Sequence, residues 1–404
     1  MTLRSVKLFI ISKFIESDKD PIDASKNMIS SIQKLVGIHN VFGDPDRHIS
    51  FGSIFGMFLC AGAFIYVGTF SQSVYLINVF PDKVECFKAI NCLSSTCIPM
   101  SKYIFMWTSS ARLKKIFAMS QQGLNSVTDE RARLKIVKTL QSGQYVSWLV
   151  VLNQAASHMI YLILPLLLTI IGNDKYLPTT PGEIYGFSSA KESPYFEIAF
   201  ALIIVATAFS AINQTGYIVL FVTLLSHELG HIYAITETLN QIQKVMYDET
   251  IPKDEKNKSV DDKLRFCVKH HQFFMQYHAK IRKLYKIIFG CHFLLMTIVL
   301  VTTLQTLNAW NLSNTILTGV TGVLPLFVYC FGGELLFSAE NEMSLAAYSC
   351  GWELMKVKQA KIVCFVLALS ERPLYLTAAD IFIMNRDTFG TVVQVVYKIY
   401  AVFN

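Results

Sequence analysis

One short run of residues has the spacing of a zinc enzyme. His227, Glu228 and His231 complete an H-E-x-x-H pattern. On a helix, residues four apart share one face, so both imidazoles could hold Zn²⁺ while Glu228 acts as the general base. The longer metzincin pattern needs Gly and His where Ala234 and Glu237 stand. Two interpretations follow: an intramembrane zinc metalloprotease or, as we favour, a polar helix face that is solvated or packed, with no metal and no catalytic residue.

The overall composition indicates which class of protein contains this run. Of the 404 residues, 52% are hydrophobic and only 16% are charged, whereas about 25% of the residues of a soluble globular chain are charged. This shortage of charge excludes a disordered chain and argues against an ordinary cytosolic enzyme. Because the surplus of apolar side chains must face something other than water, the composition predicts a polytopic membrane protein.

Long segments of low charge give the membrane topology. Each is long enough to cross a hydrocarbon core of about 30 Å as a helix. The seven segments are 50–78, 85–108, 143–172, 195–225, 286–307, 314–337 and 380–404. The predicted fold class is therefore an all-α membrane protein with seven transmembrane helices, and the H-E-x-x-H run falls just past the fourth of them.

Basic residues are distributed unequally between the two sides of these segments. The connections on the side of the N-terminus contain 29 Lys and Arg residues, and those on the other side contain three, Lys83, Lys175 and Lys191. Because Lys and Arg accumulate in cytoplasmic loops, the N-terminus is predicted to be cytoplasmic and the C-terminus extracellular. This orientation is opposite to that of a G-protein-coupled receptor. The basic residues are expected to meet anionic lipid, and nothing indicates nucleic-acid binding.

Apolar residues recur at helical spacing in the cytoplasmic connections. The pattern from Leu229 to Met246 predicts that the fourth span continues beyond the membrane, followed by a flexible charged segment, 248–263, and a second helix, 264–286. The run Ile362–Leu369 is too short to cross a bilayer and must be buried in protein. The predicted organisation is a cytoplasmic segment 1–49, a six-helix ligand-binding bundle 50–337 with a cytoplasmic extension 226–286, cytoplasmic anchor helices 338–379 and a seventh helix 380–404. A transporter is a further alternative, although the two halves show no evident repeat.

The C-terminal region carries the most specific motifs. The sequence AAYSCGW ends at Trp352, ERPLYLTAA ends at Ala379, and Phe389 precedes a final segment that ends in VYKIYAVF. This pattern resembles the insect odorant receptor family, in which AAYxxxW precedes QRPLxLTAG, a Phe and a last helix ending like AYSVFTVL. The motifs cover the chain from about residue 340 onward. The TYxxxxxQF signature of the related gustatory receptors is absent.

The resemblance implies a ligand-gated, non-selective cation channel without cofactors. Such a chain is expected to be the odorant-tuned subunit of a heterotetramer with a shared co-receptor, in the plasma membrane of olfactory sensory neurons. By match to the family's final helix, Val402 falls at the hydrophobic gate, and helical spacing adds Val395 and Lys398 to the same face. Lys398 departs from the family, which usually has a small polar residue there. It either faces a neighbouring helix or lipid, as we favour, or lowers conductance.

The family also implies a pocket for a small, volatile, apolar ligand in the outer half of the subunit, between spans two, three, four and six. Each candidate is alternatively a plain core residue. The candidates are His158 and Tyr161 on span three, Phe196, Phe200 and Ile203 on span four, and Leu324 and Phe327 on span six. Burying about 200–300 Å² of apolar surface contributes roughly 5–8 kcal/mol, which predicts responses in the micromolar range.

Overall fold

The computed structural model describes residues 21–35, 51–172, 175–178, 184–187, 192–307, 312–370 and 374–403, and nearly all of them are helical. The elements are α2 (Pro21–Leu35), α3 (Phe51–Phe64), a π-helical stretch η1 (Ile65–Phe70), α4 (Ser71–Val79), α5 (Lys83–Thr108), α6 (Ser110–Asn125), α7 (Glu130–Ile171), α8 (Tyr195–Tyr247), α9 (Lys253–Gln305), α10 (Leu312–Tyr348), a 3₁₀ turn η2 (Trp352–Leu354), α11 (Val357–Ser370), strands β1 (Thr377–Ala378) and β2 (Phe382–Ile383), and α12 (Arg386–Phe403).

Each of the seven predicted membrane segments coincides with a helix. The first corresponds to α3, η1 and α4 together, and the others to α5, α7, α8, α9, α10 and α12. Within the described residues, five stretches are apolar and long enough to cross a membrane by length and composition alone: Phe55–Val79, Glu130–Ile171, Tyr195–Tyr247, Lys253–Gln305 and Thr321–Leu354. The other two helices, α5 and α12, carry basic residues such as Lys102 and Lys398 within their length.

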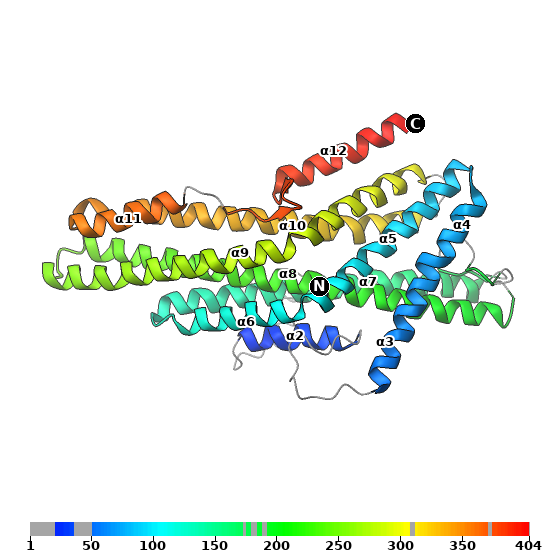
Figure 1. The fold of residues 1–404 in the computed structure, drawn as a ribbon, viewed down its shortest axis with the longest axis horizontal. Helices are drawn as coiled ribbons and strands as arrows, with labels where there is room; N and C mark the ends of the chain where they lie inside the picture. The colour runs from blue at the N-terminus through cyan, green and yellow to red at the C-terminus, as the bar shows by residue number, and fades with distance from the viewer. Residues whose placement is uncertain are drawn as a thin grey trace.

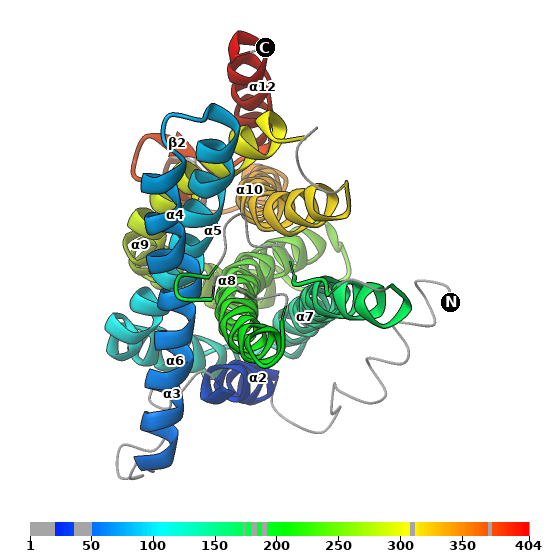
Figure 2. The same cartoon turned by 90° about the vertical axis from the view of Figure 1, so that its right-hand side faces the viewer.

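Helix α8 lies at the centre of the bundle. A view along the long axis shows α2, α3, α5, α7 and α10 arranged around it (Figure 2), and α8 packs against all of them and against α9. Every residue from Thr215 to Ile232 is buried, over several complete helical turns. A helix that is buried on all sides needs neighbours on all sides. The helices that carry the candidate ligand residues, α7 and α10, are therefore held in place by their contacts with α8.

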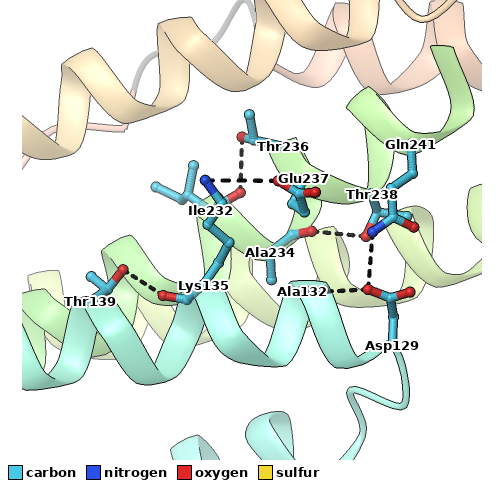
Figure 3. A network of polar contacts seen from close by, with 10 residues as sticks. All are labelled: Asp129, Ala132, Lys135, Thr139, Ile232, Ala234, Thr236, Glu237, Thr238 and Gln241. Carbon is cyan, nitrogen blue, oxygen red and sulfur yellow. Dashed lines mark hydrogen bonds and ion pairs between the residues drawn. The ribbon is translucent and has the colours of Figure 1, made fainter. Parts of the chain in front are cut away.

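Several helices continue well past the membrane segments and pack together beyond them (Figure 1). We call this part the helical extension; it comprises α6, α11 and residues 130–142, 226–247 and 253–285. Polar contacts join α7 to α8 there (Figure 3): Lys135 pairs with Glu237 at 3.8 Å, and the Gln241 amide donates to Asp129 at 3.1 Å. Asp129 also caps the start of α7 by accepting from the backbone N–H of Ala132.

The charged segment 248–263, predicted to be flexible, is instead mostly helical, because α9 begins at Lys253. Its first turn follows Pro252 and contains Asp254 and Glu255, whose charges favour a helix N-terminus. Two tertiary contacts hold the charged turns in place. Lys263 Nζ donates to Gln241 Oε1 at 2.5 Å, and Gln359 Nε2 donates to Asp261 Oδ1 at 2.9 Å.

Helix α11 contains the run Ile362–Leu369, which the sequence predicts to be buried. One face fits that prediction, since Val363 and Val366 are buried against the extension. The opposite face is open in the single chain, where Phe365 is 55% exposed. An apolar helix face left open in this way is typical of a surface that meets another protein.

The last membrane helix begins at Arg386 rather than at residue 380 as predicted. The strands β1 and β2 pair antiparallel just before it, with Thr377 opposite Ile383. Ala379 and Asp380 make the turn with positive φ angles of 55° and 57°. Asn385 then caps α12 by accepting from the backbone N–H of Thr388 at 2.9 Å. We call residues 377–383 the hairpin.

The packing of the extension gives a direct prediction for stability. Leu239 of α8 is 1% exposed, whereas Leu345 of α10 is 65% exposed. We expect Leu239→Ala to destabilise the protein by about 2–5 kcal/mol, because it leaves a cavity in packed helices. Thermal unfolding of the purified protein measures this effect, with Leu345→Ala as the matched control. Equal melting temperatures for the two variants would contradict the packing described here.

Candidate functional site

The polar side chains of the H-E-x-x-H run pack against other helices. Each of its three polar side chains contacts a different partner on another helix, within a region where all of them are buried. The contacts are Ser120 Oγ with His227 Nδ1 at 2.5 Å, Glu228 Oε1 with His278 Nδ1 at 3.0 Å, and His231 Nδ1 with His270 Nε2 at 3.1 Å. The part of the chain that the structure describes contains no group of three or more His, Cys, Asp or Glu side chains with the arrangement of a metal site.

Burial keeps His231 of this run and its partner His270 uncharged. Desolvation lowers the pKa of His231 well below its ordinary value and lowers the pKa of His270 to about 4. Two neutral imidazoles can share one hydrogen bond, with one ring donating and the other accepting. The polar residues of the H-E-x-x-H pattern thus connect α8 to α6 and α9 in the interior of the extension.

A buried carboxyl group connects the end of α10 to the chain just before the hairpin. Glu340, near the end of α10, accepts a hydrogen bond from the backbone N–H of Leu374 at 2.8 Å and is 2% exposed. Burial raises the pKa of Glu340 to about 7. The charge state of this carboxyl therefore changes near neutral pH, at the point where the chain turns toward the hairpin.

The hairpin is seated tightly on α9 and α10. The backbone N–H of Ala379 donates to the carbonyl of Lys286 at 2.8 Å, and Asp380 pairs with Arg282 at 3.2 Å and with Lys286. Gly333 allows the closest approach, because a Cβ atom at this position would overlap the carbonyl oxygen of Met384. The start of α12 is thereby fixed to both α9 and α10.

The three predicted gate residues lie on one exposed face of α12. Val402 is 82% exposed, Val395 is 39% exposed, and Lys398 is exposed between them. The opposite side of the helix faces the bundle, where Val396 is buried and the Phe389 ring contacts Phe327 at 5.9 Å. Both views show α12 extending away from the other helices (Figures 1 and 2). Their role as a gate stays a prediction.

The candidate ligand residues of α8 line the start of that helix. Phe196 and Ile203 are buried, and Phe200 is half-buried. The rings of Phe196 and Phe200 lie 5.9 Å apart, and the Lys175 ammonium lies 4.9 Å from the centre of the Phe196 ring. These residues form an apolar cluster with a basic side chain at one edge.

The remaining candidates are on α7 and α10. His158 is half-buried, and its Nδ1 lies 2.8 Å from the carbonyl of Gln154, one turn earlier in α7. Tyr161 packs against the central core. Leu324 is half-buried. Phe327 is 46% exposed, and its ring stacks on Phe331 of the same helix at 5.3 Å and meets Phe389 of α12. Their role in ligand binding also stays a prediction.

Sequence reasoning missed a second aromatic group. Tyr66 donates a hydrogen bond to the carbonyl of Tyr185 at 2.5 Å, and the rings of Phe70 and Tyr185 meet edge to face at 5.6 Å. The backbone N–H of Tyr185 donates to Ser71 at 3.3 Å. Tyr185, which follows α7 in the chain, thus packs against the π-helical stretch and the start of α4. The only sequence signal was the spacing of Tyr66 and Phe70, one helical turn apart.

Comparison with known proteins identifies the family. A sequence profile described as 7tm Odorant receptor matches residues 83–397. The chain belongs to this odorant receptor family. Two Drosophila melanogaster proteins are similar over part of their length. Odorant receptor 10a is 28% identical over 140 residues, which is 33% of this chain and 34% of the relative. Odorant receptor 85c is 28% identical over 76 residues, which is 19% of this chain and 20% of the relative.

Solved structures of an insect olfactory receptor share the fold. The receptor OR5 from Machilis hrabei in complex with eugenol superposes with a TM-score of 0.77 at 16% identity, over 95% of this chain and 99% of that one. The structure of OR5 described without eugenol gives a TM-score of 0.75 at 17% identity, over the same shares. The chain spans about a third and a fifth of the two Drosophila relatives, but nearly all of the OR5 fold.

These findings confirm the family resemblance and the predicted all-α fold with seven transmembrane helices. The odorant receptor is a membrane-spanning receptor and not a zinc protease. Within the C-terminal motif, Glu371–Pro373 lie outside the described residues, as do most of the predicted segment 1–49 and its continuation at residue 50. The sequence signal for the family nevertheless extends far upstream of that motif, to residue 83.

The close contact between the chain after the hairpin and Gly333 predicts that two Gly→Ala substitutions on α10 will change the melting temperature differently. Gly333→Ala should lower the melting temperature, because the new Cβ atom collides with backbone that cannot move without displacing the hairpin. Gly319 lies on the same helix with nothing within 4 Å of its Cβ position. Gly319→Ala is therefore the control and should leave the melting temperature unchanged or raise it. A tolerated Gly333→Ala would refute the tight seat.

The buried carboxyl group of Glu340 predicts a pH-dependent stability. Its pKa is raised from 4.5 in the unfolded chain to about 7. The stability that Glu340 contributes is therefore fully present below pH 4.5 and is lost as the pH rises through about 7. Glu340→Gln should match the wild type at low pH and melt at a higher temperature above neutral pH. Glu342→Gln, at an exposed position of the same helix, should show no such pH-dependent gain.

Proposed function

We propose that this odorant receptor is the odorant-tuned subunit of a ligand-gated, non-selective cation channel formed with a shared co-receptor. The observation that carries the proposal is the open face of α12, where Val395 and Val402 project away from the bundle. Apolar side chains exposed on a membrane helix need lipid or a neighbouring subunit against them. Copies of this helix around one axis would bring the valines together in a central ring.

A ring of valine side chains can act as a gate. A narrow apolar constriction excludes water and therefore ions, and a small dilation restores conduction. The hairpin supplies the mechanical connection, because it fixes the start of α12 to α9 through Lys286 and to α10 at Gly333. A shift of α10 relative to α8 would then be transmitted to the gate.

The proposed ligand is a small, volatile, apolar molecule bound among the candidate residues of α7, α8 and α10. The cluster around Phe196 and Phe200 offers aromatic surface for such a ligand. Changing the open probability from 1:99 to 99:1 requires about 5.5 kcal/mol of differential affinity. This is most of the roughly 5–8 kcal/mol that burying a small ligand supplies, so the response falls in the micromolar range.

The helical extension is proposed to be the cytoplasmic anchor that assembles the subunits. The exposed face of α11, with Phe365 at 55% and Val357 at 73% exposure, supports an interface there. The excess of Lys and Arg in the connections on this side supports the cytoplasmic placement of the extension and of the N-terminus. The expected location is the plasma membrane of olfactory sensory neurons.

Electrical recording tests the proposed function. Cells that express the chain together with an insect odorant co-receptor should give odorant-evoked cation currents, which persist when G-protein signalling is blocked. Cells with either subunit alone provide the controls, and the chain alone should give no current. Currents that require G-protein signalling, or silence for a broad panel of esters, alcohols and aldehydes despite surface expression of both subunits, would contradict the proposal.

The position of Lys398 gives a prediction about conductance. The sequence alone favours a Lys398 that faces a neighbouring helix or lipid. Its exposure on the same face as Val395 and Val402 instead supports a side chain that points toward the pore, where a positive charge repels cations. Lys398→Thr should increase single-channel conductance, and Lys398→Arg, which keeps the charge, should not. Unchanged conductance in Lys398→Thr would show that the ammonium faces a neighbouring helix or lipid instead.

A further inference from the structure

A lysine is buried in the middle of the bundle and forms no ion pair with any acidic side chain that the structure describes. Lys102 of α5 is completely buried, and its ammonium group has no hydrogen-bond partner among the described residues. Among the ion pairs of the described residues, Glu228 pairs with His278 and Glu334 pairs with Arg386, and neither pair includes Lys102. A buried ammonium ion is costly unless an opposite charge or several hydrogen-bond acceptors surround it.

Aromatic side chains from three other helices surround this ammonium group. Its Nζ lies 5.2 Å from the ring centre of Tyr217 and 5.8 Å from that of Tyr329. The Tyr217 ring also contacts Tyr285 at 5.6 Å, and the Tyr329 ring contacts His292 at 5.2 Å. These five side chains, all at most 1% exposed, form one contiguous group that we call the Lys102 cage.

The polar atoms of the cage lack hydrogen-bond partners within the described part of the chain. The hydroxyls of Tyr217, Tyr285 and Tyr329 and both ring nitrogens of His292 are buried without a hydrogen-bond partner in the described protein. The ammonium has three donors and no acceptor, whereas each hydroxyl and a neutral imidazole has one donor and can also accept. Aromatic faces attract the cation but cannot accept hydrogen bonds from the hydroxyls as an anion can. The five side chains together have seven donors and one cationic group, and none of them carries a negative charge.

From this juxtaposition we propose that the Lys102 cage binds a small inorganic anion, with chloride as the abundant candidate. The anion balances the buried charge of Lys102 and accepts hydrogen bonds from the hydroxyl groups. None of the five side chains is a candidate ligand residue, and on α8 Tyr217 lies several helical turns from Ile203. It links α5, α8, α9 and α10, so the bound anion would stabilise the packing of the bundle.

Thermal unfolding of the full-length receptor in lipid nanodiscs tests the proposal. The melting temperature is compared in sodium chloride and in sodium gluconate of equal ionic strength, because gluconate is too large for a buried site. At a chloride concentration of about ten times the dissociation constant, binding to the folded state should raise the melting temperature by about 2 °C. Lys102→Met should lose this rise. Lys138→Met, which removes an exposed lysine from α7, should keep it.

Two results would overturn the proposal. One is a wild-type melting temperature that is the same in both salts, as expected if water alone occupies the cage. The other is an equal rise in Lys102→Met, which would place the chloride effect elsewhere. If Lys102→Met does not fold, the double variant Tyr217→Phe, Tyr329→Phe keeps both rings and removes two donors. It should raise the half-saturating chloride concentration several-fold, and an unchanged value would also refute the site.

Discussion

Burial of the middle of α8 on all sides is the constraint on which the rest of the structure depends. From Thr215 to Ile232 no face of this helix meets solvent, so other helices must cover it completely. Its apolar part packs within the membrane bundle, and its polar part, with His227, Glu228 and His231, packs within the extension. In the extension each of these polar side chains needs a hydrogen-bond partner, since an unpaired buried polar group destabilises the folded state. Ser120, His270 and His278 meet that need.

The same constraint explains why a zinc-enzyme pattern arises in a receptor. A helix that passes from lipid into a protein interior changes from apolar residues to polar residues that can be paired. Histidine suits such a position, because burial keeps His231 and His270 neutral while their rings still form a hydrogen bond. The spacing of the pattern follows from the helical repeat, and the identity of each partner depends on α6 and α9.

Local patterns in the sequence predicted those features of the fold that depend on neighbouring residues, such as helices and their faces. Hydropathy located the membrane helices, and the i, i+3 and i+7 spacing placed Val395, Lys398 and Val402 on one face of α12. The start predicted for α9, at residue 264, was wrong, because tertiary contacts of Asp261 and Lys263 hold the charged segment before it in a helix. The hairpin was missed for the same reason: its seat depends on Lys286 and Gly333. Nothing in the residues beside Lys102 indicates that it is enclosed by rings from other helices.

Thiol accessibility along α12 tests the central claim that its exposed face lines the conduction path. Single cysteines would replace Val402, on the exposed face, and Val396, which is buried against the bundle. In cells that also express the co-receptor, a charged thiol reagent should reduce the odorant-evoked current of Val402→Cys. It should leave the currents of Val396→Cys and of the wild type, with its native cysteines, unchanged. Block at position 396 without block at 402 would show that the opposite face of α12 meets the ions, which contradicts the account.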